Sequence, residues 1–485
     1  MLPISELLYG VRLKQTAGAM DRVPTAITQD SRRVQPGGIF VAVPGTLADG
    51  HAYITKALEL GAAVIVCEHL PAQVDEYEAT YVVVEDSADA LGHLAAGFYG
   101  HPSRKLTLAG VTGTNGKTTI ATLLYQLFTG LGYKTGLLST VENRIGAEVV
   151  PATHTTPDPV ALNKLLATMV EQGCTHAFME VSSHAVVQRR IAGLDFNGAI
   201  FSNLTRDHLD FHRTMANYIK AKKRFFDEVG PGAFALTNVD DKQGRVMVQN
   251  THARIKTYAL EAPADYKGRF MAASVQGSEL EIDGRQVWLS LPGRFNAYNG
   301  MAVYATAVEL GEPADEVLRV LSTLRGAPGR FETITSANAI TAVVDYAHTP
   351  DALKNVLETI NDLRQGQERI ITVVGAGGDR DPGKRPEMGA MAAKLSDKVI
   401  LTADNPRSED PATIIDQMAG GVAISARKKL LREPDRRIAI EKALAMATPG
   451  DIVLIAGKGH ETYQEIAGVK HPFDDRVEVR RVMGL

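Results

Sequence analysis

The sequence predicts an α/β protein of three domains, in which the middle domain carries a phosphate-binding loop on a parallel sheet. At about 150 residues per domain, a chain of 485 residues allows about three domains. Short apolar runs alternate with helical spacers along the chain, which is typical of βαβ units. Glycine and proline clusters interrupt this alternation near 97–105 and 326–332. We therefore expect domains at 1–102, 103–330 and 331–485.

The composition excludes several functional classes. With 45% hydrophobic and 22% charged residues, the chain matches a folded enzyme. A net charge of −4 provides no overall positive field, so we expect no nucleic-acid partner. Cys67 and Cys174 are too few for a disulfide framework or a Cys-x-x-Cys zinc site, which fits the cytoplasm. No apolar run reaches the roughly 18 residues of a membrane span, and the N-terminus lacks a signal-peptide pattern. We expect a cytoplasmic protein with no membrane insertion.

The first domain has three strand-like runs, at 37–43, 62–68 and 80–86, separated by turns and helical spacers. They predict one small α/β unit. In the third domain, four apolar runs each lead into polar and glycine residues. Ligands bind outside the carboxyl ends of strands in open α/β sheets, so we expect these four loops to converge on one site. The four runs are 339–348, 369–381, 398–407 and 451–461.

The second domain opens with the loop GVTGTNGKTT (110–119), which follows an apolar strand and precedes a helix, as a phosphate-binding loop requires. Its glycines allow backbone N–H groups to close around phosphates, and the helix N-terminus favours negative charge. Lys117 would reach the β- and γ-phosphates, and the Thr118 hydroxyl would bind Mg²⁺. Glu180, which ends the run HAFMEV, is the expected second acid near the metal; otherwise it is a surface carboxylate. The segment TNVDD (237–241) lacks the guanine-specific lysine, which favours adenine.

Six segments together resemble the Mur ligases of peptidoglycan synthesis and follow that family's order. The resemblance implies a uridine-nucleotide domain, a central ATPase domain and a C-terminal Rossmann-like domain that admits an amino acid. It also implies ATP-driven amide formation through an acyl phosphate, whose anionic partners require cations such as Mg²⁺, Lys117, Arg380 and Lys384. We expect a monomer. The segments are GTNGKTT (113–119), EVSSH (180–184), NLTRDHLDFH (203–212), GRFNAYN (293–299), DYAHTPDAL (345–353) and GGDRDPGKRPEMG (377–389).

The resemblance assigns catalytic roles to Lys117, Lys222 and His208. Lys222 resembles a lysine that family members carbamylate, which would turn an ammonium into an anion able to bind Mg²⁺. Lys220 and Lys223 are adjacent alternatives. His208 resembles a histidine beside a second metal site, and otherwise orients its loop. The implied metal ligands are Thr118, Glu180, carbamylated Lys222 and His208.

The implied nucleotide contacts extend from the loop to the hinge and the third domain. Asn296 and Asn299 lie three residues apart at a helix start, where capping is the alternative role. His348 is otherwise a polar cap at a strand end. The ATP-binding residues are Gly113, Thr114, Asn115, Gly116, Lys117, Thr118, Thr119, Asn296, Asn299, Arg330, Asp345 and His348.

Two further sets of residues resemble the contacts to the other substrates. Hydroxyl and guanidinium groups suit a UDP-muramoyl-dipeptide with its carboxylates: Ser31, Thr155, Thr156, Ser182, Gln188 and Arg190. The segment DNPR (404–407) resembles the motif of ligases that add meso-diaminopimelate. A planar guanidinium can bind the distal carboxylate of diaminopimelate with two parallel hydrogen bonds, whereas L-lysine has no such carboxylate. As an alternative, Arg407 forms a structural ion pair. The expected diaminopimelate contacts are Arg380, Asp404, Asn405, Pro406, Arg407, Gly457 and Glu461.

The resemblance therefore implies a ligase that adds meso-2,6-diaminopimelate to the D-glutamyl carboxylate of UDP-N-acetylmuramoyl-L-alanyl-D-glutamate. Three alternatives stay open at this point. They are an L-lysine-adding ligase, a ligase like folylpolyglutamate synthetase, and a switch that binds ATP without forming a bond. Phosphate release that depends on both other substrates would distinguish an enzyme from a switch.

Overall fold

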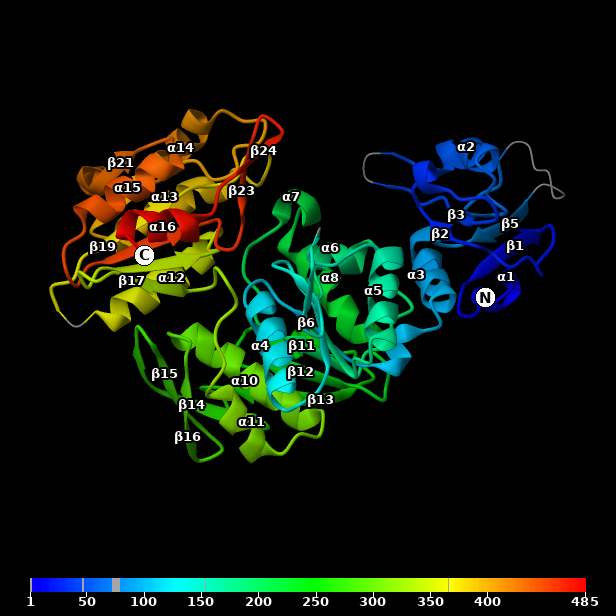
Figure 1. Ribbon diagram of the computed structural model, residues 1–485, viewed down its shortest axis with the longest axis horizontal. Coiled ribbons are helices and arrows are strands. Elements are labelled where there is room, and N and C mark those ends of the chain that lie inside the picture. The colour runs from blue at the N-terminus through cyan, green and yellow to red at the C-terminus, as the bar shows by residue number, and fades with distance from the viewer. Residues whose placement is uncertain (1, 46–47, 72–78, 153, 365) are drawn as a thin grey trace.

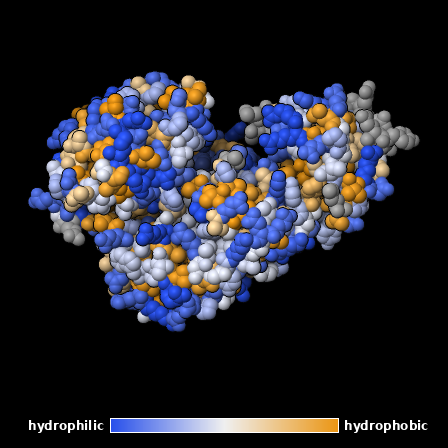
Figure 2. Space-filling model, in the orientation of Figure 1, coloured by the Kyte–Doolittle hydropathy of each residue, from blue (hydrophilic) through white to orange (hydrophobic). Residues whose placement is uncertain are grey.

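The computed structural model describes residues 2–45, 48–71, 79–152, 154–364 and 366–485. Three main sheets organise these residues, and the first and third units lie on opposite sides of the second (Figure 1). Figure 2 shows the surface hollowed between the first and third units. The sheets come from separate stretches of chain, and the exact domain boundaries stay a prediction. Within the described ranges, no helix is long and apolar enough to cross a membrane.

The first unit is a five-stranded sheet in which the inner strands are buried and rich in β-branched residues, as strands covered on both faces require. Its strands are β1 (Leu13–Ala17), β2 (Ile27–Thr28), β3 (Ile39–Val41), β4 (Val64–Cys67) and β5 (Thr80–Val84). Their order is β1-β5-β4-β3-β2, with only β1 antiparallel to its neighbour. The helices are α1 (Ile4–Leu7), α2 (Ile54–Glu59) and α3 (Ser87–Phe98).

The second unit is built on eleven strands. They are β6 (Thr107–Thr112), β7 (Thr135–Leu138), β8 (Asn143–Ile145), β9 (Glu148–Val150), β10 (His176–Glu180), β11 (Gly198–Phe201), β12 (Phe234–Asn238), β13 (Arg254–Ala259), β14 (Tyr266–Ser274), β15 (Gly277–Ile282) and β16 (Arg285–Leu289). Their order is β16-β15-β14-β13-β12-β11-β6-β10-β7-β8-β9. The strands from β14 to β7 in this order are parallel, which confirms the predicted parallel sheet. Antiparallel strands, absent from the prediction, extend both edges.

Helices cover both faces of this second sheet. Because side chains alternate along a strand, Ala109 and Val111 of β6 belong to one hydrophobic core, whereas Leu108 belongs to the other. The helices are α4 (Lys117–Gly130), α5 (Pro159–Glu171), α6 (Ser183–Val187), α7 (Leu209–His212), α8 (Met215–Glu228), α9 (Gly244–Met247), α10 (Arg294–Glu309) and α11 (Ala314–Leu321).

The third unit contains the four predicted apolar runs as neighbouring strands of one sheet. Its strands are β17 (Glu332–Thr335), β18 (Thr341–Asp345), β19 (Ile370–Val374), β20 (Lys398–Leu401), β21 (Leu430–Arg432) and β22 (Ile452–Ala456), with a separate hairpin of β23 (Tyr463–Ile466) and β24 (Val469–Pro472). The order is β17-β18-β22-β19-β20-β21, and β18, β22, β19 and β20 are parallel. Their carboxyl ends therefore share one edge, as predicted. The helices are α12 (Pro350–Leu363), α13 (Lys384–Leu395), α14 (Pro411–Gly420), α15 (Arg436–Met446) and α16 (Asp475–Met483).

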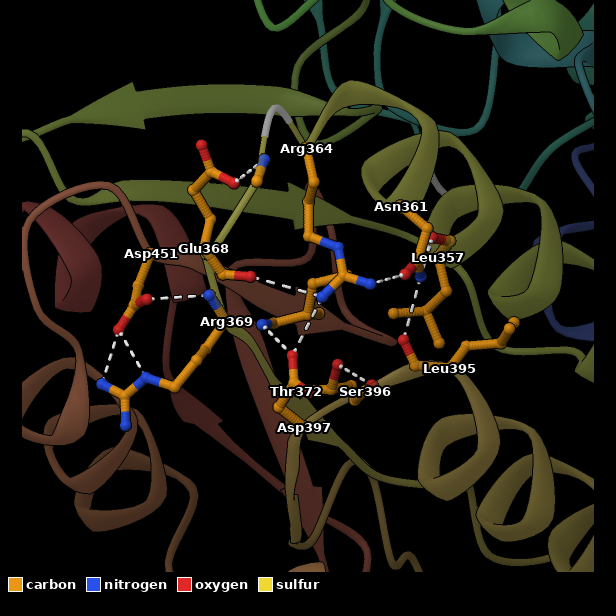
Figure 3. A network of polar contacts seen from close by, with 12 residues as sticks. Leu357, Asn361, Arg364, Glu368, Arg369, Thr372, Leu395, Ser396, Asp397 and Asp451 are labelled. Atoms are coloured by element: carbon orange, nitrogen blue, oxygen red, sulfur yellow. Dashed lines mark hydrogen bonds and ion pairs between the residues drawn. The ribbon is translucent and has the colours of Figure 1, made fainter.

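A polar network joins the opposite, amino-terminal edge of this third sheet (Figure 3). Arg369, just before β19, donates through Nη2 to Asp451 Oδ2 at 2.6 Å, and Asp451 lies just before β22. The Ile370 N–H donates to Asp397 Oδ2 at 2.9 Å, and Arg364 donates to the same oxygen at 3.1 Å. Although burial opposes it, hydrogen bonding by Arg369 lowers the pKa of Asp451 to about 2. These contacts fix the strand starts away from the candidate site.

Candidate nucleotide and amino-acid site

The phosphate loop joins β6 to α4 and requires glycine at two positions. Gly113 and Gly116 have φ values of +150° and +88°, which favour glycine. A Cβ on Gly113 would collide with the Ser202 hydroxyl, and one on Gly116 would collide with the Asn299 amide oxygen. The loop is held by neighbouring backbone, since the Thr114 N–H donates to the Asn203 carbonyl at 2.8 Å. A closely packed loop thus leads directly into the N-terminus of α4, which is the geometry of an anion site.

Lys117 folds back over this loop. Its Nζ donates to the carbonyl oxygens of Gly113 at 2.9 Å and Thr114 at 2.7 Å. Burial lowers the pKa of Lys117, while the carboxylates of Glu180 and Asp207 oppose that shift. The amino group therefore lies at the centre of the loop that would surround the phosphates.

Thr118 and Glu180 meet at the adjacent strand end. The Thr118 hydroxyl donates to Glu180 Oε1 at 2.9 Å, and the Thr140 N–H donates to the same oxygen at 2.7 Å. Arg330 Nη2 donates to Thr118 Oγ1 at 3.1 Å. A hydroxyl and a carboxylate oxygen suit Mg²⁺, which commonly completes its shell with phosphate and water oxygens. In the part of the chain that the structure describes, no group of three or more His, Cys, Asp or Glu side chains could hold a metal ion unaided.

Lys222 approaches the phosphate loop from α8. Its side chain is 1% exposed, and Nζ donates to the Gly113 carbonyl at 2.6 Å and lies 4.7 Å from the centre of the Tyr218 ring. Burial, together with the charge of Lys117, lowers the pKa of Lys222 well below its ordinary value. The two alternative lysines differ, because Lys220 is exposed and Lys223 pairs with Asp227 at 2.5 Å. Of these three lysines, only Lys222 contacts the loop.

His208 has a left-handed backbone with φ +54°, and its Nε2 lies 3.3 Å from Asp207 Oδ2. Its ring makes an edge contact with His184, with ring centres 4.8 Å apart. His348 bonds through Nδ1 to the Tyr346 carbonyl at 2.8 Å, and Asp345 accepts from the Phe331 N–H at 2.7 Å. The contacts of His208 and His348 are consistent with the alternative roles of orienting a loop and capping a strand end. The metal contact of His208 and the ATP contacts of Asp345 and His348 stay predictions.

Asn296 and Asn299 lie on α10 and are both buried. Asn296 Nδ2 donates to the Pro292 carbonyl at 2.8 Å and Asn299 Nδ2 donates to Asn296 Oδ1 at 3.0 Å. Neither side chain caps the helix, because the N-cap residue is Gly293 and no side chain accepts a cap hydrogen bond there, so the alternative capping role is wrong. Asn299 also packs against Gly116, so the pair supports the phosphate loop. Their contact with adenine stays a prediction.

Five of the six residues expected to bind the muramoyl-dipeptide gather beside Glu180. Arg190 Nη1 donates to the Thr156 carbonyl at 2.6 Å, and Arg190 Nη2 donates to Gln188 Oε1 at 2.6 Å. Thr156 Oγ1 donates to the Glu180 carbonyl at 2.9 Å and accepts from the Ser182 N–H at 3.3 Å. Thr155 extends this group, because its hydroxyl accepts from Thr140 at 3.0 Å. Ser31 lies apart, on the 3₁₀ helix Ser31–Arg33 of the first unit.

The loops after β20 and β22 bring together the residues expected to bind diaminopimelate. Asn405 Nδ2 donates to Glu461 Oε2 at 2.8 Å. Arg407, with φ +53°, donates through Nη1 to the Gly378 carbonyl at 2.6 Å, and its Nε lies 3.6 Å from Glu465 Oε2. The contact with Glu465 corresponds to the structural ion pair that was the alternative role for Arg407. It is weak, because the two atoms are farther apart than hydrogen-bond distance.

The other residues expected to bind diaminopimelate lie in or beside the same loops. A Cβ on Gly377 would lie 3.1 Å from Arg407 Nη1 and 3.7 Å from Arg380 Cγ, so the two arginines flank one backbone position. Asp404 is buried beside Gly457, at 3.2 Å between Oδ2 and a Cβ built on that glycine. Pro406 lies between Asn405 and Arg407 in the same loop.

The sequence reasoning missed three residues that the fold brings to the site. Asp351 accepts from Asn115 Nδ2 of the phosphate loop at 3.1 Å, which ties that loop to the third unit. The Tyr346 ring lies under the Arg330 guanidinium at 4.3 Å. Lys458 is completely buried among the loops after β20 and β22. The motif GKGHE (457–461) directly after a buried strand was the available signal for Lys458.

Comparison with known proteins identifies the family. Family models match as "Mur ligase family, catalytic domain" over 24–99, "Mur ligase middle domain" over 111–307 and "Mur ligase, glutamate ligase domain" over 329–459. The chain is 58% identical over 99% of both chains to a UDP-N-acetylmuramoyl-L-alanyl-D-glutamate–2,6-diaminopimelate ligase of Cytophaga hutchinsonii. A relative of the same name from Parabacteroides distasonis is 56% identical, again over 99% of both chains.

Solved structures agree with this result. A structure described as UDP-N-acetylmuramoyl-L-alanyl-D-glutamate–2,6-diaminopimelate ligase is 34% identical, with a TM-score of 0.70 over 100% of this chain and 99% of that one. A folylpolyglutamate synthase of Mycobacterium tuberculosis is 18% identical, with a TM-score of 0.62 over 81% of this chain and 94% of that one, and so shares the fold alone. The resemblance drawn from the six sequence segments is confirmed, and the chain belongs to the Mur ligase family.

Proposed function

We propose that this chain is an ATP-dependent ligase that joins meso-2,6-diaminopimelate to the D-glutamyl carboxylate of UDP-N-acetylmuramoyl-L-alanyl-D-glutamate. One observation carries the proposal: Arg407 and Glu461 border the same site at the carboxyl ends of β20 and β22. A guanidinium suits a carboxylate and a carboxylate suits an ammonium, so the pair matches one amino-acid end of diaminopimelate. Relatives at 58% and 56% identity that bear the corresponding name support this substrate.

The phosphate loop would supply the energy for the bond. Lys117 and the N–H groups at the start of α4 would hold the phosphates, while Thr118 and Glu180 would hold Mg²⁺. Mur ligases use ATP and Mg²⁺, and the metal neutralises phosphate charge when it is bound. Lys117 and Arg330 would stabilise the charge that develops as the bond between the β- and γ-phosphates of ATP breaks, ADP leaves, and the γ-phosphoryl group passes to the D-glutamyl carboxylate.

The second half of the reaction forms the amide. The amine of diaminopimelate attacks the carbonyl carbon of the acyl phosphate, a proton leaves the nitrogen, and the tetrahedral intermediate expels inorganic phosphate. Thr155, Thr156, Ser182, Gln188 and Arg190 would hold the dipeptide part next to the phosphate loop, and Ser31 would contact the uridine nucleotide. The remaining predicted ATP contacts, Gly113 to Thr119, Asn296, Asn299, Asp345 and His348, keep the roles that the resemblance implies.

We also propose that Lys222 is carbamylated in the active protein. Its lowered pKa favours the neutral amine, which can attack carbon dioxide to form an N–C bond with loss of a proton to water. The product is an anion beside Lys117, whose charge would then stabilise Lys222 instead of repelling it. A carbamate at this place could reach Mg²⁺ together with His208. A monomeric state and a cytoplasmic location stay predictions from the sequence.

Amino-acid-dependent phosphate release tests the function. Purified protein is given ATP, Mg²⁺ and UDP-muramoyl-dipeptide, with meso-diaminopimelate or L-lysine in parallel reactions. We expect phosphate release with diaminopimelate and much less with lysine. Efficient use of lysine would favour the lysine-adding alternative. Slow phosphate release that is indifferent to both amino acid and dipeptide would indicate a switch and refute the ligase.

A further inference from the structure

A completely buried lysine lies behind the proposed amino-acid site. Lys458 lies two residues after the end of β22, and its side chain has 0% exposure. Its Nζ donates to Glu461 Oε2 at 2.9 Å, to Asn405 Oδ1 at 3.0 Å and, more weakly, to Asp404 Oδ1 at 3.4 Å. An ammonium has three N–H donors, so these three acceptors satisfy it. Lys458 therefore has no donor left for a ligand.

These bonds fix the orientation of two side chains that border the site. Asn405 Oδ1 accepts both from Lys458 and from the Glu465 N–H at 2.9 Å, so the amide NH₂ must face Glu461. Glu461 Oε2 accepts from Lys458 and from Asn405. Within the described residues, the other carboxylate oxygen, Oε1, makes no hydrogen bond. That oxygen is the one available to a ligand ammonium.

Lys458 also sets the charge of this group of residues. Its ammonium lies between the carboxyl groups of Asp404 and Glu461 and offsets part of the repulsion between them. Burial and the nearby Asp404 raise the pKa of Glu461, and Lys458 opposes this rise. Without Lys458, Glu461 would more readily take up a proton and lose its attraction for a cation.

We propose that Lys458 is a positioning residue for the amino-acid substrate, which holds the side chains of Glu461 and Asn405 in place and leaves the free oxygen of Glu461 to the ligand ammonium. The inference rests on the proposed function, because it concerns the same site. Lys458 acts through Glu461 and Asn405 and does not touch the ligand. Its role is therefore in binding the amino acid, not in binding ATP.

The test compares Lys458→Met, which keeps an unbranched side chain but removes the ammonium group, with wild-type protein in the phosphate-release assay. We expect the KM for meso-diaminopimelate to rise at least tenfold, while the KM for ATP and for UDP-muramoyl-dipeptide stays within twofold. Lys429→Met is the matched control, since Lys429 lies in the same unit and donates to the carbonyls of Ala393 and Ser396, away from the site. This control should leave all three KM values unchanged. If Lys458→Met does not fold, Lys458→Gln replaces it in the assay.

A double-mutant cycle separates positioning from simple structural support. If Lys458 acts through Glu461, Lys458→Met combined with Glu461→Gln should raise the KM for diaminopimelate no more than Glu461→Gln does alone. Additive effects, or a KM for diaminopimelate within twofold of wild type in the folded Lys458 variant, overturn the inference. Failure of the proposed function is distinguishable, because then the wild-type protein itself would release no phosphate in response to diaminopimelate.

Discussion

Replacing Arg407 by alanine tests the amino-acid site most directly. One Arg407 donor is used by the Gly378 carbonyl at 2.6 Å, and the Nε contact with Glu465 at 3.6 Å is weak. The far end of the guanidinium can therefore form two parallel bonds to a carboxylate. Hydrogen bonds between charged groups contribute about 1.5–3 kcal/mol each. Water can replace part of the lost interaction in the variant. We therefore expect transition-state stabilisation to fall by about 2 kcal/mol, which lowers kcat/KM for diaminopimelate about 30-fold.

The loop itself should survive this substitution. Its backbone bonds, from the Arg407 N–H to the Glu465 carbonyl at 3.0 Å and from the Ala467 N–H to the Arg407 carbonyl at 2.7 Å, do not involve the side chain. Arg407 has a positive φ, but alanine and arginine are similarly disfavoured there. Arg407→Lys, which keeps the charge without the planar fork, should recover only part of the lost activity.

The assay is phosphate release at a range of diaminopimelate concentrations, with L-lysine in parallel. Because lysine lacks the distal carboxylate, its poor use should be unaffected by Arg407→Ala. Arg432→Ala is the control, since Arg432 forms an exposed ion pair with Asp416 in the same unit, and such pairs contribute about 0–1 kcal/mol. A kcat/KM for diaminopimelate within threefold of wild type, or an equal loss for lysine, would refute the assignment of Arg407.

Three further predictions concern the metal site, the joint between units and acid stability. Glu180→Gln should raise the Mg²⁺ concentration for half-maximal phosphate release at least tenfold, measured by Mg²⁺ titration. Arg189→Ala removes the guanidinium that joins Asp89 of α3 to the exposed Glu228 of α8, and should cost about 1–2 kcal/mol in thermal unfolding. Because the pKa of Asp451 is lowered in the folded protein, its ionised carboxylate stabilises the fold at pH values above its ordinary pKa of 3.8. This stabilisation is lost as the pH falls toward 2. Urea unfolding at pH 7 and pH 3 should show Arg369→Met less stable at pH 7 and less sensitive to acid.

Local features of the sequence were enough to predict much of the fold. The phosphate loop at 113–119 is recognisable because strand, glycine turn and helix follow one another directly. The four strands of the third unit are recognisable because each is a buried run that ends in polar residues. The antiparallel strands β15 and β16 were missed, since both contain polar residues and neither forms a continuous apolar run.

The sequence by itself determined the family, the parallel sheets and the chemistry of the loops, because these depend on neighbours along the chain. Only the tertiary structure decided which side chains of distant loops contact one another. Asn115 bonds to Asp351, 236 residues away, and Arg330 bonds to Thr118, 212 residues away. The role inferred for Lys458 depends equally on contacts with Asp404 and Asn405 across two strands. The motif GKGHE marks Lys458 as a residue at a strand end, but it does not show which residues are its partners, because those contacts arise only when separate strands pack into one sheet.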